Sequence, residues 1–236
     1  MSIIAKSLSR ENEVLETLEK IVNSGLEYTL IGGYAVTARG RHRYSVDCDI
    51  VAAELGRFKK LLGREGYRIE EHSNAFRDVY GGESYKFMKG VLGSEVSVDI
   101  FVRSLVIRQT AATWSFEYLR KYSSAADVPG IQKAVHNVMV PDKEMLIATK
   151  IHPARLQDIQ DIVILVDKVD WSEVAMHTKR GRLDEVKKQI NFILSRLEDP
   201  KLRSDLKSQF EVKGDIENEL ARTKEALRLV LDGILK

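Results

Sequence analysis

The stretch from residue 31 to residue 51, IGGYAVTARGRHRYSVDCDIV, constrains the fold and chemistry of this chain more than any other. Its pattern predicts a strand end, a double glycine, a short helix, a basic turn and a second strand that carries Asp47 and Asp49. Because side chains alternate between the faces of a strand, both carboxylates should project from one face and Cys48 from the other. Two like charges side by side repel each other, and a divalent cation between them would remove that penalty.

Composition narrows the class of protein. With 236 residues, 44% of them hydrophobic and 31% charged, the chain can form one large domain or two modest ones. A net charge of +2 does not mark a general nucleic-acid binder, so any recognition of polyanions would be local. Cys48 is the only cysteine, which excludes an intramolecular disulfide and a multi-cysteine zinc site. The early charges and the lack of a long apolar run predict a cytoplasmic protein without a secretory signal or membrane span.

The first half of the chain alternates between helical and strand-like periods. Apolar residues at helical spacing predict a helix over residues 9–24, with Ser9 as its N-cap. Residues 28–31 form a short buried strand in this interpretation, and residues 55–62 form a helix. From residue 67 the hydrophobic pattern repeats every two residues, as in strands. This pattern predicts a meander attached to the first two strands. Its strands are expected at residues 67–70, 76–80, 84–88 and 95–102.

Beyond the meander the pattern becomes mainly helical. Residues 114–122 are expected to form a helix, a loop should surround Pro129, and residues 137–140 should form a strand. Pro141 should open a helix, because proline suits a first turn and the acids after it favour a helix N-terminus. This helix should run to Pro153, and a second helix should follow directly. Four more helices are expected, at residues 172–179, 183–197, 202–210 and 216–234.

Together these elements predict an α+β (mixed α/β) fold. A small mixed β-sheet flanked by helices should be followed by an all-helical C-terminal region. We place the boundary near Trp171, which gives a catalytic domain over residues 1–170 and a helical region over residues 171–236.

Three acids are candidates for metal-based chemistry. Asp47, Asp49 and Asp99 lie on strands of one predicted sheet, each facing away from the aliphatic side of its strand. Magnesium prefers hard oxygen ligands and keeps waters and substrate phosphates in its remaining positions. Two such ions can stabilise both the attacking and the leaving oxygen of a phosphoryl transfer. The alternative is a set of surface acids on a solvated sheet face, and for a D-x-D pattern alone that alternative is favoured.

The double glycine shifts this balance. Gly32 and Gly33 between a strand and a helix let the backbone approach a ligand and present amide groups at a helix N-terminus, where anions bind. Alone, the pair would indicate only a tight turn. A metal pair beside an anion-binding helix start outlines a site for a nucleoside triphosphate.

These residues carry a resemblance to a known family. Gly32-Gly33, then Ser45-Val46-Asp47-Cys48-Asp49 and a later Asp99 resemble the signature of the DNA polymerase β-like nucleotidyltransferase superfamily. More narrowly, the run HRYSVDCD is similar to AbiEii/AbiGii toxin-type nucleotidyltransferases, and the run KIHPARLQDIQDI, which starts at Lys150, resembles a later motif of that family. The resemblance covers roughly residues 30–161.

The resemblance implies a role for each matching residue. Asp47 and Asp49 would bind two Mg²⁺ ions, with Mn²⁺ as the alternative metal, and Asp99 would bind the catalytic ion and help to deprotonate the acceptor hydroxyl. The β- and γ-phosphates would be held by Gly32, Gly33 and Ser45.

Basic residues complete the candidate site. We expect Arg43 to contact the nucleotide. For Arg39, Arg41 and His42, contact with the triphosphate or acceptor and exposure in a solvated basic turn are about equally favoured. Lys150 lies in an apolar run, where a lone ammonium group is costly unless it is paired. It would bind a phosphate oxygen or neutralise the carboxylates. For Arg155, Asp158 and Asp161 we favour a structural role along one side of a helix.

The expected activity is transfer of a nucleoside monophosphate from an NTP to an acceptor hydroxyl, with release of pyrophosphate. Two alternatives stay open: a toxin–antitoxin-type transferase acting on tRNA or protein, and a nucleotide-binding protein without turnover. The acceptor can be a small molecule, tRNA or protein. The helical C-terminal region would cover the cleft or form a dimer contact. The candidate protein partners are a second copy of the chain, in a homodimer, and an antitoxin-like protein.

Overall fold

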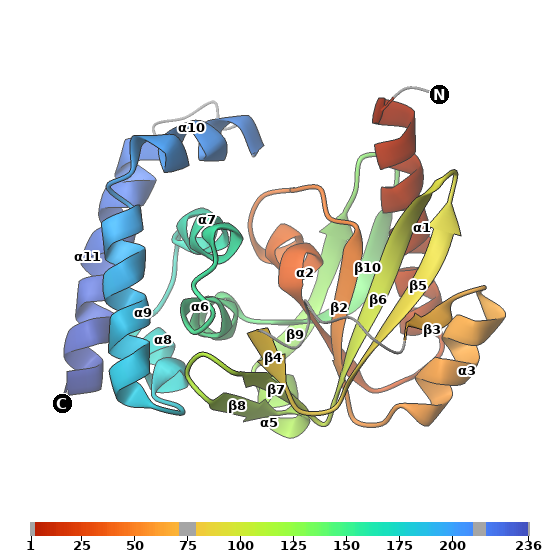
Figure 1. Ribbon diagram of the computed structural model, residues 1–236, viewed down its shortest axis with the longest axis horizontal. Helices are drawn as coiled ribbons and strands as arrows, with labels where there is room; N and C mark the ends of the chain where they lie inside the picture. Colours follow the sequence, from red (N-terminus) through yellow and green to blue (C-terminus); the bar gives the residue numbers. More distant parts are fainter. Residues whose placement is uncertain (1–2, 71–78, 210–215, 236) are drawn as a thin grey trace. The chain divides into compact units, whose positions relative to one another are not determined.

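The computed structural model describes residues 3–70, 79–209 and 216–235 (Figure 1). Its contacts group the chain into two compact units. The first unit comprises Met1–Ala38, His42–Leu105 and Trp114–Pro141, and the second comprises Arg39–Arg41, Val106–Thr113 and Asp142–Lys236. Each unit is described by itself below.

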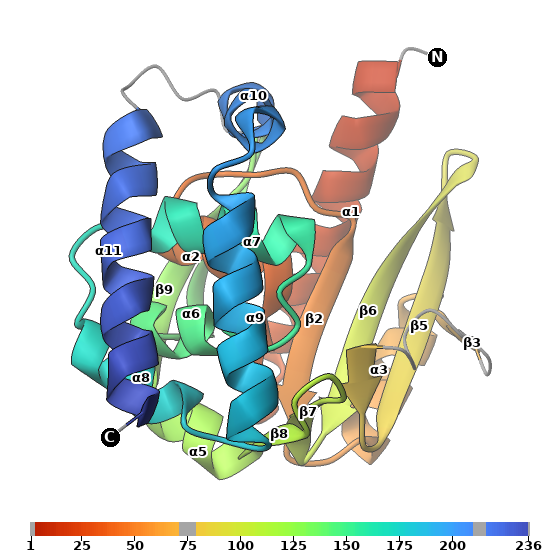
Figure 2. The same ribbon diagram turned by 60° about the vertical axis from the view of Figure 1, so that its left-hand side comes forward.

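A mixed sheet forms the centre of the first unit. Within it, β1 runs antiparallel to β2, β2 runs parallel to β6, and β6, β5 and β3 follow in antiparallel order. This arrangement confirms the predicted small mixed sheet, in which β2, β6, β5 and β3 can be followed in Figure 2. Of the predicted meander, β3, β5 and β6 lie in this sheet, whereas Tyr80 belongs to a strand of another sheet. The strands in spatial order are β1 (Tyr28–Ile31), β2 (Asp47–Ala52), β6 (Ser94–Val102), β5 (Ser84–Val91) and β3 (Arg68–Glu70).

Helix α1 (Ile3–Asn23) packs against this sheet. Its buried residues, among them Val14, Leu18 and Ile21, follow the helical spacing that the sequence indicates. The predicted N-cap is wrong, because the helix already begins at Ile3. Ser9 lies inside the helix, and its Oγ donates to the Ala5 carbonyl at 2.9 Å, the local bond that a serine within a helix commonly makes.

Two further helices follow strands of the sheet directly. Helix α2 (Gly32–Arg39) begins at the double glycine immediately after β1, and α3 (Gly56–Arg64) follows β2. Both were expected from the sequence. The basic turn was predicted from Arg39, but α2 includes Arg39 and the turn begins at Gly40.

The middle of the chain contains strands that the sequence did not reveal. Strands β9 (Ser123–Pro129) and β10 (Ala134–Pro141) form an antiparallel hairpin, where we expected a loop and a shorter strand. Pro141 ends β10 instead of opening a helix, because Asp142 is the N-cap of α6 (Lys143–Ile151). Helix α5 (Phe116–Lys121) is shorter than predicted, since the Ser115 side chain caps it by accepting from the Tyr118 amide.

A three-stranded sheet with the order β4-β7-β8 was also not expected. The predicted strand at residues 76–80 falls mostly outside the described residues. The members of this sheet are β4 (Tyr80–Gly81), β7 (Ser104–Ile107) and β8 (Ala112–Ser115).

Helices α6 to α11 belong to the second unit, which confirms the predicted helical C-terminal region. Helices α6 and α7 contact one another, α6 also contacts α8 and α9, and α11 contacts α7 to α10. The last change between the compact units along the chain follows Pro141, whereas the domain boundary at residue 170 stays a prediction. No helix in the described ranges is long and apolar enough to cross a membrane. The remaining helices are α7 (Leu156–Leu165), α8 (Trp171–Thr178), α9 (Leu183–Arg196), α10 (Pro200–Gln209) and α11 (Ile216–Leu235).

Candidate active site

The three predicted aspartates lie together on one face of the central sheet. In the parallel pairing of β2 with β6, Asp49 lies opposite Asp99 and Asp47 lies opposite Ser97. The Ser97 hydroxyl donates to Asp47 Oδ1 at 2.7 Å, which fixes that carboxylate on the sheet. Cys48 points the other way and is fully buried. The alternation that the sequence predicts therefore brings three carboxylates to one place.

Asp99 is the most deeply buried of these acids. Only 3% of the residue is exposed, and its Oδ1 has no hydrogen-bond partner among the described residues. Lys86 on β5 is paired with Asp99 in the sheet, and its Nζ lies 3.6 Å from Asp99 Oδ2. Burial and repulsion from Asp49 and Asp47 raise the pKa of Asp99 well above its usual value, although Lys86 acts in the opposite direction. The site thus holds more negative charge than its own residues neutralise.

Gly32 lies directly against this cluster. Its φ is +71°, and a Cβ added there would overlap the carboxylate of Asp49. Only glycine satisfies both the left-handed backbone and this close approach. A Cβ on Gly33 would lie 2.9 Å from both Arg43 Nη2 and Ser45 Oγ. The start of α2 is therefore packed against the predicted nucleotide-binding side chains and against the acids.

The turn between α2 and β2 is held by hydrogen bonds within the first unit. Tyr34, buried in α2, donates from its hydroxyl to the Ser45 carbonyl at 2.8 Å, and Ser45 Oγ donates to the Asp47 carbonyl at 3.3 Å. The Arg43 amide donates to Thr37 Oγ1 at 3.3 Å, and the residue is 6% exposed. Sequence reasoning missed Tyr34 and Thr37, because the pattern there predicts only a short helix.

A buried acid on α1 anchors the same turn. Glu11 Oε1 lies 2.8 Å from His42 Nε2, and Glu11 Oε2 accepts from the Ile131 amide at 2.8 Å. Burial raises the pKa of Glu11, but the hydrogen bonds from His42 and Ile131 outweigh it, so the pKa lies below its usual value. These contacts give His42 a structural partner that sequence reasoning missed, although Glu11 lies three and four residues before Val14 and Leu15 on the buried side of α1.

The other basic residues of the turn belong to the second unit. Arg41 Nη2 lies 2.6 Å from Glu219 Oε1 on α11, and Arg39 Nη2 lies 3.6 Å from Asp142 Oδ1. Both guanidinium groups therefore have carboxylate partners there.

Lys150 also belongs to the second unit and lies in a buried charge cluster on α6 and α7. Its Nζ lies 3.1 Å from Asp158 Oδ1 and 2.7 Å from Asp161 Oδ2. Arg155 Nε lies 2.7 Å from the other Asp158 oxygen. Burial raises the pKa of Asp158, but Lys150 and Arg155 together hold it below its usual value. This arrangement agrees with a structural role for the two aspartates, and a nucleotide contact by Lys150 stays a prediction.

The carboxylates fit a hard cation, most of whose ligands are water molecules and substrate oxygens. Across residues 3–70, 79–209 and 216–235, no three His, Cys, Asp or Glu side chains form a complete metal-binding set. Magnesium needs no such set, since one or two carboxylates with substrate phosphates are its usual protein site. The unbonded Asp99 Oδ1 and the repulsion between Asp49 and Asp99 are features that a divalent cation would satisfy.

The sequence matches no known protein-family profile and no curated protein. Among solved structures, the chain is similar to a proposed nucleotidyltransferase from H. pylori, with a TM-score of 0.49, 15% identity and coverage of 100% of this chain and 98% of that one. It is also similar to JHP933 from Helicobacter pylori, with a TM-score of 0.49, 14% identity and coverage of 97% and 93%. The antibiotic-resistance factor ANT(2'')-Ia matches with a TM-score of 0.39, 15% identity and coverage of 86% and 92%. At these scores the similarities do not assign an activity to this chain.

Proposed function

We propose that the chain is a magnesium-dependent nucleotidyltransferase of the DNA polymerase β-like type. It would transfer a nucleoside monophosphate from an NTP to an acceptor hydroxyl and release pyrophosphate. The observation that carries this proposal is the register of β2 with β6, which sets Asp49 opposite the buried Asp99 while Gly32 lies against Asp49. A purely structural sheet gains nothing from this clustering of charge.

The acids have distinct roles in the proposed reaction. Asp47 and Asp49 would hold two divalent ions, and Asp99 would hold the one on the acceptor side. When bound, such ions neutralise charge on the phosphates and on the leaving pyrophosphate. Asp99 would lie on the acceptor side, where its carboxylate could accept the proton of the acceptor hydroxyl. Ser97, by donating to Asp47, keeps that carboxylate oriented.

The start of α2 supplies the phosphate-binding part of the proposal. Gly33, Ser45 and Arg43 lie within a few ångströms of one another, so backbone amide, hydroxyl and guanidinium donors converge beside the acids. A helix N-terminus with such donors favours anions. The β- and γ-phosphates would bind there, and the α-phosphate would face the acids.

Incubation with α-labelled NTPs, Mg²⁺ or Mn²⁺ and candidate acceptors (small molecules, tRNA and protein) tests this proposal. Asp49→Asn and Asp99→Asn should each lower transfer by at least about 100-fold, equivalent to ~2.7 kcal/mol of barrier. Asp184→Asn is the matched control, since this α9 side chain is 91% exposed. Equal transfer by the control and the two site variants would refute the assignment.

A measurement without turnover separates the site from the reaction. Mn²⁺ should raise the melting temperature of the wild-type protein, and the rise should be much smaller for Asp99→Asn, because binding to the folded state alone stabilises it. Binding of an NTP in the presence of the metal, without transfer to any acceptor, would support a nucleotide-binding protein without turnover.

A further inference from the structure

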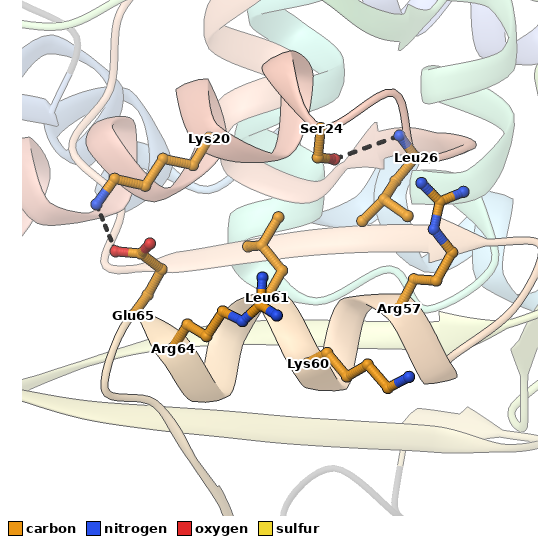
Figure 3. A pocket seen from close by; sticks show the side chains of 8 residues that line it. All are labelled: Lys20, Ser24, Leu26, Arg57, Lys60, Leu61, Arg64 and Glu65. Atoms are coloured by element: carbon orange, nitrogen blue, oxygen red, sulfur yellow. Dashed lines mark hydrogen bonds and ion pairs between the residues drawn. The ribbon is translucent and has the colours of Figure 1, made fainter.

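A basic pocket lies between α1 and α3 in the first unit, and it shares no residue with the candidate active site. Its volume is about 380 Å³. Figure 3 shows cationic side chains around the apolar pair Leu26 and Leu61, with four of the lining residues supplied by the exposed side of α3. The lining residues are Lys20, Ser24, Leu26, Arg57, Lys60, Leu61, Arg64 and Glu65.

The charges of this pocket are not balanced by its own residues. Lys20 forms an ion pair with Glu65, which neutralises one cation. The side chains of Arg57, Lys60 and Arg64 form no ion pair within the described part of the chain, and all three are exposed. Elsewhere in the same unit, Lys89 and Lys133 are paired with carboxylates. The pocket is therefore a local positive site on a chain whose net charge is only +2.

The spacing of the three cations suits a row of phosphates. Arg57, Lys60 and Arg64 lie three and four residues apart, so they follow one side of α3. At 1.5 Å per residue, they span roughly 10 Å of helix axis. Three cations in such a row can pair with up to three phosphates of a strand that lies along the helix.

A membrane surface fits the same charges less well. A helix that lies on a membrane needs apolar side chains free to enter the lipid. In α3, Phe58 and Leu62 are 1% and 0% exposed because they belong to the core, and Leu61 is the one large apolar residue of this helix that lines the pocket. The charged side of this helix is thus free for a ligand, whereas its apolar side is already used.

From these observations we propose that the pocket binds the phosphodiester backbone of a nucleic-acid strand through Arg57, Lys60 and Arg64. The contact is electrostatic and independent of base sequence. It needs neither the carboxylates nor an NTP, so its test does not depend on the proposed nucleotidyl transfer.

Fluorescence anisotropy with labelled 20-nucleotide RNA and DNA strands, without nucleotide or metal, measures this binding for the full chain. Three neutralised phosphates predict a salt slope near −2, so a change from about 50 to 200 mM salt should weaken binding about 20-fold. Lys60→Gln should reduce this change to about 7-fold, and the triple variant Arg57→Gln, Lys60→Gln, Arg64→Gln should nearly abolish binding.

Lys59→Gln provides the matched control, because Lys59 is an exposed neighbour on the same helix that does not line the pocket. It removes the same charge and should bind like the wild type. Equal losses for Lys59→Gln and Lys60→Gln would overturn the proposal, as would wild-type binding that the triple variant retains. Binding to phosphatidylserine vesicles but not to either strand would also overturn it, and the preference between RNA and DNA identifies the natural strand.

Discussion

Gly32 and Asp49 occupy the same small space: a Cβ on Gly32 would overlap the carboxylate of Asp49. The residue that follows β1 and the acidic face of β2 are therefore in such close contact that even one added carbon atom would not fit between them. This contact places the N-terminus of α2 beside the acids, which is where a triphosphate would lie between helix and metal. The catalytic proposal thus depends on a residue without a side chain as much as on the carboxylates.

Gly32→Ala should cost both stability and transfer. The φ of +71° alone should destabilise the variant by about 1–2 kcal/mol, and displacement of Asp49 should lower transfer in addition. Gly25→Ala is the matched control, since Gly25 has a φ of +66° but nothing within 4 Å of an added Cβ. Chemical unfolding and transfer assays on both variants check this. If the two variants lose the same activity, the contact with Asp49 has no catalytic importance.

Glu11→Gln should destabilise the turn that carries the basic residues. The change weakens the hydrogen bonds to His42 and Ile131 within a buried site, which should cost about 1–3 kcal/mol. Since the pKa of Glu11 lies below 4.5, its stabilisation is complete above pH 4.5 and is lost as the pH falls through the lowered value. Unfolding curves of wild type and variant should therefore converge in acid. The exposed Glu16 on the same helix gives a control variant, Glu16→Gln, that should show no such difference.

Lys150→Met should be strongly destabilising, because it leaves Asp158 and Asp161 as buried charges without their ammonium partner. The loss should be about 3–5 kcal/mol. The triple variant Lys150→Met, Asp158→Asn, Asp161→Asn should recover much of it, since the carboxylates are then neutral. The KM for the NTP in this triple variant separates the two roles of Lys150. An unchanged KM would contradict a direct phosphate contact, whereas a raised KM in a stable protein would support it.

His152 should make the second unit sensitive to acid. Burial lowers its pKa to about 3, and its Nδ1 lies 2.7 Å from Thr110 Oγ1. The unfolded state binds the proton more readily, so the contribution of His152 to stability is complete above about pH 6.5 and declines as the pH falls toward 3. His152→Gln should flatten the dependence of melting temperature on pH between these values. His136→Gln, at a side chain that is 67% exposed, should leave the dependence as it is in the wild type.

The sequence was sufficient for the parts of the site that depend on local periodicity. Alternation along β2 and β6 placed Asp47, Asp49 and Asp99 on one face, and the double glycine located the start of α2. The pairing of Asp49 with Asp99 needed the register of two strands that are far apart in the sequence. No single-strand pattern contains that information.

The residues that sequence reasoning missed have long-range partners. Glu11 lies on the buried side of α1, but its partners His42 and Ile131 are 31 and 120 residues away in the sequence. Strand β9 has the sequence SSAADVP, which has few β-branched residues, so its pairing with β10 overrides its local preference. The partners of Lys150 were visible as a spacing of acids, but their ion pairs depend on how α6 meets α7.

The parallel pairing of β2 with β6 has a consequence for the order in which the protein matures. The hairpin of β5 and β6 is local in the chain and can close early, whereas β2 must be joined across α3 and the β3–β5 segment. Asp99 therefore reaches Asp49 only after that loop has closed. The carboxylate pair depends on a long-range strand pairing, so chemical competence requires the assembled sheet and cannot arise from any one local segment.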